Sequence, residues 1–238
     1  MMKSRYFSLI FGCLFTILSC QNTIDNNKDR PDTVKFVEKS EEYEIPEKGI
    51  DAIPEEIAIF IEWFRHDNSE IEKYQIYRQT DPLDDFYLID TIQDTFYIDI
   101  ITDIIPRYYY YVIAVNYDNI KSESSDTLSY QLLEKPTPLA PSGLSQSVSP
   151  DFQWEDHTQP QANYYILRVI RSDDGAVIWN ATVQANLGFA IQNNPYNSDQ
   201  SASISELKRG IGYQWRVDVI GSEDFCGSES VWTSFQIQ

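Results

Sequence analysis

Histidine, cysteine and basic residues are scarce in this sequence. Among its 238 residues there are 2 histidines and 3 cysteines, too few and too scattered for the three- or four-ligand cluster that a zinc site needs. Lysine and arginine number 18 against 37 aspartates and glutamates, which gives a net charge of −19 at pH 7. A chain of this charge is repelled by nucleic acid and by anionic lipid headgroups, so we expect neither as a partner.

The sequence also lacks the motifs of common enzyme classes. There is no Gly-x-Ser-x-Gly, no His-Glu-x-x-His and no glycine-rich phosphate loop. With 37 carboxylates, acid pairs of the glycosidase kind occur anywhere by chance. His66 and His157 follow expected strands and are predicted to be solvated turn residues, and the acidic residues in 81–85 and 173–174 lack the spacing of a calcium loop. We predict no catalytic residue, no metal and no cofactor.

One apolar run stands near the start, at residues 6–18, behind the basic Lys3 and Arg5. It is too short to cross a bilayer, which takes about 20 residues, and fits a removable secretory signal. It leads into Ile17-Leu18-Ser19-Cys20, which resembles a bacterial lipobox, although Leu18 stands where a small residue is usual. The resemblance implies a signal peptide over residues 1–19 and lipidation of Cys20. The alternatives are cleavage at Cys13, a plain cleaved signal and a signal anchor.

A lipidated Cys20 would hold the chain on a membrane. One acyl chain binds a bilayer only marginally, whereas the several chains of such lipoproteins, palmitate among them, anchor it permanently. Gln21, standing where the family uses aspartate for inner-membrane retention, points to the outer membrane and to presentation at the cell surface. Loss of residues 1–19 removes two basic residues and no acid, so the net charge becomes −21. Residues 20–44 are mostly polar and predict a flexible tether.

Cys226 is then the one mature cysteine besides Cys20, so no intrachain disulfide is expected. We expect its thiol to be packed or quietly exposed, with an intermolecular disulfide as the alternative. The hydrophobic core must therefore hold the fold by itself. With 5 tryptophans, 16 tyrosines and 12 phenylalanines, the composition makes such a core plausible.

Two segments, residues 107–116 and 212–220, repeat one pattern about a hundred positions apart. Both are rich in β-branched and aromatic residues and both follow turn signals, which predicts strands. When the two are aligned, residues at every second position correspond: Tyr108 with Tyr213, Tyr110 with Trp215, Val112 with Val217, and Ala114 with Val219. Such residues share one face of a strand. Because the same pattern of core-facing residues occurs twice, the sequence predicts two copies of the same domain.

Short strands with turns every 8–12 residues and no helical period predict an antiparallel β-sandwich in the first copy. Trp63, Tyr74 eleven residues later, and the run from Tyr108 through Val112 to Ala114 resemble a fibronectin type III domain. In that family these features lie on the second, third and sixth strands. The resemblance covers residues 45–134.

Residues 135–141 contain three prolines and predict a semi-rigid linker. Residues 142–238 repeat the pattern, with Tyr165 eleven residues after Trp154 and Leu207 six before Tyr213, and with an insertion near residues 184–200. The predicted fold is all-β: two tandem immunoglobulin-like, fibronectin type III-like antiparallel sandwiches after a signal peptide and tether. A single large jelly roll is the rival architecture, and the proline linker and the duplicated order argue against it.

If Tyr108, Tyr110 and Val112 point inward, their neighbours point outward. The candidate binding face of the first domain comprises Tyr77, Tyr109, Tyr111 and Ile113. The corresponding outward positions of the second domain, Gln214, Arg216 and Asp218, are polar. Tyrosine suits both sugar stacking and protein interfaces, whereas the purely structural alternative is a ladder of cross-strand pairs.

These observations together predict a lipid-anchored protein of the cell envelope that acts without catalysis. Its partner would be a glycan or a protein bound through the β-sandwich domains. The alternative is a structural spacer or an assembly subunit of a surface complex, and a hydrolase is a remote alternative.

Overall fold

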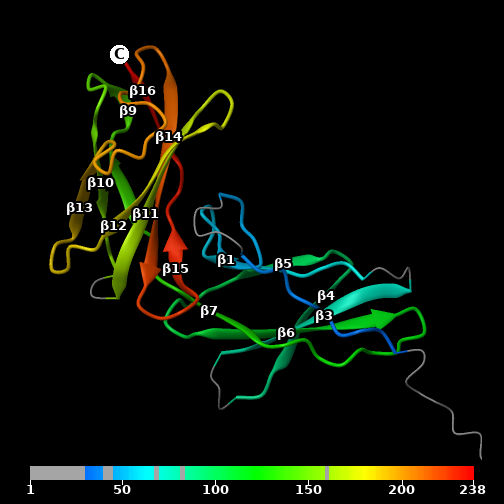
Figure 1. Cartoon of the computed structure of the whole chain (residues 1–238). Coiled ribbons are helices and arrows are strands. Elements are labelled where there is room, and N and C mark those ends of the chain that lie inside the picture. Colours follow the sequence, from blue (N-terminus) through cyan, green and yellow to red (C-terminus); the bar gives the residue numbers. More distant parts are fainter. Residues whose placement is uncertain (1–29, 40–44, 67–69, 81–83, 159–160) are drawn as a thin grey trace, which may run out of the picture.

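The computed structural model describes residues 30–39, 45–66, 70–80, 84–158 and 161–238, and the fold is all-β (Figure 1). Every regular element of the described residues is a strand, and the sheet pairings are almost all antiparallel. The predicted fold class, two sandwiches in tandem, is confirmed. Cys20, the signal peptide and residues 40–44 lie outside the described residues.

The first sandwich packs a three-stranded sheet against a four-stranded one. The smaller sheet has the order β1 (Ile50–Ala52), β2 (Ala58–Glu62), β5 (Phe96–Ile100), and the larger has the order β4 (Tyr87–Ile92), β3 (Ile71–Gln79), β6 (Tyr108–Asn116), β7 (Leu128–Leu132). Trp63 directly follows the second strand, Tyr74 lies on the third and Tyr108 opens the sixth. These are the places that the fibronectin type III resemblance implies.

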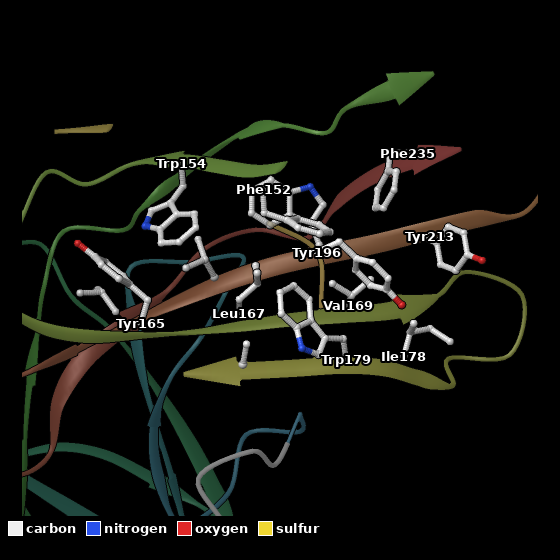
Figure 2. Packing of buried hydrophobic residues seen from close by; sticks show 14 of the residues in the cluster. Phe152, Trp154, Tyr165, Leu167, Val169, Ile178, Trp179, Tyr196, Tyr213 and Phe235 are labelled. Carbon is white, nitrogen blue, oxygen red and sulfur yellow. The ribbon is translucent and has the colours of Figure 1, made fainter. Parts of the chain in front are cut away.

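The second sandwich repeats this division. Its smaller sheet has the order β13 (Ile191–Pro195), β10 (Asp151–Glu155), β8 (Thr137–Ala140), and its larger sheet runs β12 (Val177–Gln184), β11 (Ala162–Arg171), β14 (Gly212–Gly221), β15 (Cys226–Glu229). The last strand, β16 (Thr233–Ile237), continues along β14 and also pairs with β9 (Gly143–Ser145). Figure 2 shows the aromatic core of this sandwich. Within this core the rings of Phe152 and Trp215 meet edge-on, with 5.0 Å between centroids.

Each sandwich has a hydrophobic core of its own. One core gathers around Trp63, Tyr74 and Tyr110, and the other around Trp154, Tyr165 and Trp215. All eight residues of the repeated inward face are buried, each with at most 4% of its surface exposed. Two separate cores exclude the single jelly roll that the sequence left as a rival architecture.

The two sandwiches nevertheless share one continuous sheet. β15 of the second sandwich lies parallel to β7 of the first, with Cys226 opposite Gln131 and Gly227 opposite Leu132. The amide of Gln131 donates to Phe225 O at 2.9 Å and that of Leu133 donates to Gly227 O at 3.1 Å. In Figure 1 the red β15 arrow therefore meets the green β7, and the long axes of the sandwiches lie crosswise.

The structure departs from the predicted tether at residues 30–39. Val34 is buried in the first core, Phe36 bridges Trp63, and the amide of Val37 donates to Glu62 O at 3.1 Å. This segment is an additional strand-like edge beside the end of β2. Polar composition concealed it, because the alternation consists of Val34 and Phe36 alone and charged residues surround them.

The predicted linker, residues 135–141, also differs from expectation. Residues 137–140 form β8 and pair with β10, so most of the linker is the first strand of the second sandwich. The Trp215 indole donates to Pro141 O at 2.8 Å. Proline is tolerated there because β8 is an edge strand.

Candidate binding surfaces

The tyrosine face is defined as Tyr77, Tyr109, Tyr111 and Ile113 on the outer side of β3 and β6. The register of these strands places Tyr77 opposite Tyr111, and the other two residues opposite Gln79 and Gln75. All four predicted residues are half-buried. The structure therefore brings them together on one surface, as the alternation of the strands predicts.

The rings of this face stack on one another. Tyr77 and Tyr111 lie 4.7 Å apart between centroids at 14°, and Phe86 packs on Tyr111 at 4.8 Å and 54°. Burial and the neighbouring Tyr77 raise the pKa of Tyr111 above its ordinary value. Because the flat side of Tyr111 contacts other rings, the face presents ring edges and hydroxyls more than open platforms. Phe86 escaped prediction as a member because it stands just before β4, where no alternation assigns it a face.

Of the three outward polar residues predicted for the second sandwich, Gln214 is half-buried and the other two are buried. Arg216 and Asp218 are buried, with 1% and 2% of their surfaces exposed. Arg168 on β11 is equally buried and its Nε lies 2.8 Å from Asp218 Oδ2. Arg216 Nε lies 3.0 Å from Asp218 Oδ1, and Arg216 Nη2 lies 2.9 Å from Glu229 Oε1. The first sandwich and its N-terminal segment lie against this face, which strand alternation within one domain could not foretell.

Lys135 lies at the joint between the sandwiches. Its ammonium donates to the carbonyl oxygens of Ile53, of Pro54 at 2.9 Å and of Glu229 at 3.2 Å. Burial lowers the pKa of Lys135 to about 8. The linker therefore contributes a cation that ties the first sandwich to the last strands of the second.

Beside this joint a cavity of about 1330 Å³ opens between the two sandwiches. The N-terminal segment and β1 line one side, and the outer face of β11, β14 and β15 lines the other. Arg168, Asp218 and Glu229 are among the lining residues. The cavity escaped prediction because both of its walls are surfaces of different domains.

The two histidines take structural positions. His66 Nε2 lies 2.8 Å from Asp32 O, so it donates there, and Nδ1 accepts from the Tyr74 hydroxyl at 3.2 Å. The prediction of a solvated turn residue is therefore wrong for His66, which links the N-terminal segment to the first core. His157 is partly exposed, 3.9 Å from the Glu155 carboxylate. Within the described ranges, no group of three or more His, Cys, Asp or Glu side chains is placed to hold a metal ion.

Cys226 is a free, buried thiol at the start of β15. Burial raises the pKa of its thiol above the ordinary value. Such a thiol reacts slowly because the thiolate is the nucleophile. Of the packed and the quietly exposed thiol that the sequence allowed, the structure has the packed one.

Neither candidate surface bears on membrane attachment, which was assigned to Cys20. That residue lies outside the described part of the chain. Across the part that is described, no helix has the length and apolarity needed to span a membrane. The lipid anchor therefore stays a prediction.

No model of a known protein family matches the sequence, and no curated protein matches it. A segment of two fibronectin type III domains from chicken tenascin is 13% identical, with a TM-score of 0.31 over 84% of this chain and 96% of that chain.

A crystal structure of a β-1,2-glucanase from Parabacteroides distasonis is also similar. It is 23% identical, with a TM-score of 0.33, over 42% of this chain and 12% of that chain, so the match spans a small part of that enzyme.

Proposed function

We propose that this chain is a lipid-anchored, non-catalytic binding protein of the outer membrane that contacts a partner protein through the tyrosine face. The observation that carries the proposal is the stacked and half-exposed set of aromatic rings on β3 and β6. Tyrosines of this kind are enriched where proteins contact each other, because they offer a large apolar area with a polar tip.

The ring geometry favours a protein partner over a glycan. A sugar stacks on the open flat side of an aromatic ring, whereas Tyr111 has Tyr77 and Phe86 packed against it. What this face offers is an apolar ridge of ring edges with hydroxyl groups along it. A complementary groove in another protein can cover such a ridge, so glycan binding becomes the alternative outcome of the test.

A structural spacer is the second candidate, and the sheet shared by both sandwiches favours it. The pairing of β7 with β15 and the Lys135 contacts hold the domains in one arrangement. A spacer would use this stiffness to hold a neighbouring chain at a set distance from the membrane. In that case the tyrosine face would be a ladder that only stabilises the first sandwich.

The test replaces Tyr109 and Tyr111 by serine in the full-length, membrane-anchored protein. Envelope cross-linking and a glycan array are compared for this variant, for the wild type and for Tyr117→Ser, which removes a tyrosine that is 67% exposed and lies outside the face. We expect the double variant to lose a cross-linked partner that Tyr117→Ser retains. Unchanged partner binding in a folded double variant would reject the tyrosine face and leave the spacer role.

A further inference from the structure

The strand β5 forms an open edge of the first sandwich (Figure 1). It ends the order β1, β2, β5 of the smaller sheet, and within the described residues it pairs with β2 alone. The amide of Ile101 donates to Ile57 O at 2.8 Å, so the odd-numbered residues of this stretch bond to β2, because hydrogen bonding alternates along an antiparallel pair. The backbone amides and carbonyls of Phe96, Ile98 and Ile100 therefore point the other way, to the open edge.

The side chains of the same three residues form an apolar row on the outer side of the sheet. Phe96, Ile98 and Ile100 are 45%, 41% and 66% exposed. Phe60 on β2 widens the row, because its ring stacks on Phe96 with 5.9 Å between centroids and 25° between planes. These four residues are called the β5 edge. A strand with open backbone groups and exposed apolar side chains is a template for pairing with another chain.

The β5 edge lacks the features that keep other edge strands of this protein from pairing. The edge strand β8 contains Pro138, β13 ends at Pro195, and the pairing of β4 with β3 contains a register shift. Prolines and bulges hinder the addition of a further strand. In contrast, β5 contains no proline and its register with β2 is unbroken. Its one charged residue, Asp99, is buried and already bonded to Arg78, so an added strand leaves this carboxylate as it is.

Carboxylates flank the β5 edge at both ends. At one end Glu62 lies opposite Phe96 in the register, and Asp94 stands two positions before Phe96. At the other end Glu56 stands two positions before β2. Within three positions of either strand, the charged residues that are exposed or half-buried are five acids and one base, Arg65. Two copies of this chain paired through β5 would bring these acids together, which is destabilising, whereas a strand with basic ends complements them.

We propose that the β5 edge binds an extended strand of a partner protein, which has apolar side chains at alternate positions and a lysine or arginine at each end. The backbone of this strand pairs with Phe96, Ile98 and Ile100, and its apolar side chains pack beside theirs. Its basic ends meet the flanking carboxylates. This site goes beyond the proposed function, because β5 belongs to the smaller sheet and the tyrosine face lies on the larger one.

The experiment measures binding of the peptide acetyl-Lys-Thr-Val-Thr-Val-Thr-Val-Thr-Lys-amide to the full-length protein in detergent micelles. Its valines and end lysines share one side of a strand, which matches the apolar row and the acids that flank it. Fluorescence anisotropy of a labelled form gives the Kd, hydrogen–deuterium exchange mass spectrometry locates the contact, and sedimentation velocity gives the oligomeric state. Two matched peptides carry glutamate at both ends or N-methylated valines.

The variant Ile98→Lys places a charge in the middle of the row. Its matched control is Ile191→Lys, because Ile191 is 48% exposed and lies on β13, an edge strand of the second sandwich. We expect the wild type and Ile191→Lys to bind the lysine-ended peptide saturably with the same Kd, and Ile98→Lys to bind it at least tenfold more weakly. The bound peptide should slow deuterium uptake over residues 96–100 of the wild type at least tenfold.

Both altered peptides should bind at least tenfold more weakly, because glutamate ends repel the flanking acids and N-methylated valines cannot donate to β5. The proposal is overturned if the wild type does not bind the lysine-ended peptide, or if folded Ile98→Lys or either altered peptide binds equally well. A wild-type dimer that Ile98→Lys dissociates also overturns it, since the occupant would then be a second copy. The variant with serine at both Tyr109 and Tyr111 should bind this peptide like the wild type, which separates this test from that of the tyrosine face.

Discussion

Gly227 stands at the point where the two sandwiches share a sheet, and a side chain there should disrupt their joint. A Cβ added to Gly227 would lie 2.6 Å from Val219 O, a backbone atom of β14, and 3.4 Å from the Tyr130 hydroxyl on β7. Ordinary contacts begin near 3.4 Å. Gly227→Ala therefore requires β15 to move away from β14, since the backbone oxygen cannot turn aside.

The size of the effect follows from what this movement costs. Overpacking of a close contact costs about 1–3 kcal/mol. The movement also weakens the hydrogen bonds that Gln131 and Leu133 donate across the joint, each contributing about 0.5–1.5 kcal/mol net. We expect Gly227→Ala to lower the free energy of unfolding of the second sandwich by about 2–6 kcal/mol and to loosen the two sandwiches from each other.

Chemical denaturation and small-angle X-ray scattering measure these two effects. Gly212→Ala is the matched control, because the nearest atom to its added Cβ is Ser172 Oγ at 3.4 Å. The control should unfold and scatter like the wild type. If Gly227→Ala keeps its unfolding free energy within about 0.5 kcal/mol and shows an unchanged radius of gyration, the close pairing of β14, β15 and β7 is refuted.

Three further predictions concern single side chains. Lys135 has a pKa of about 8 in the folded protein against 10.5 ordinarily. In the unfolded chain Lys135 therefore keeps its proton up to a higher pH than in the folded protein. The free energy of unfolding should rise between pH 8 and 10.5 by up to about 2 kcal/mol after allowance for solvent screening. Lys135→Met should lack this rise in denaturation curves. Among the described residues, Arg78→Met leaves the buried Asp99 carboxylate with the Tyr110 hydroxyl as its side-chain partner, 2.7 Å away, and should cost about 3 kcal/mol of unfolding free energy; a loss below about 1 kcal/mol would show that Asp99 is hydrated. Cys20→Ser should move the protein from the membrane to the soluble fraction, and retention would disprove the lipid anchor.

The interior of each sandwich could be predicted from the sequence, because a strand alternates strictly. Tyr108, Tyr110 and Val112 occupy every second position, and one face of a strand must be buried. The same rule placed Tyr109 and Tyr111 together on the outer side. Trp63 and Tyr74, which the resemblance to fibronectin type III domains assigned to the second and third strands, pack against each other with 5.4 Å between ring centroids.

The contacts between domains could not be predicted, because they depend on surfaces that have no shared period. Strand alternation correctly places Asp218 on the outer side of its own sheet. It is nevertheless buried, because the first sandwich lies against that side. Its neighbour Arg216 looks like a solvated charge in the sequence for the same reason. Within the N-terminal segment, Val34 and Phe36 gave too weak a signal because two alternating apolar residues are too few to establish a strand period.

Amide hydrogen exchange at Gln131 and Leu133 tests the central claim most directly, that two separately cored sandwiches are joined through one sheet. These amides lie on the edge of the first sandwich and donate only to carbonyls of the second. The account predicts that both exchange slowly, with protection comparable to that of the Val112 amide inside β6. Exchange of both at the rate of an open chain, with Val112 still protected, would show two independent sandwiches and contradict it.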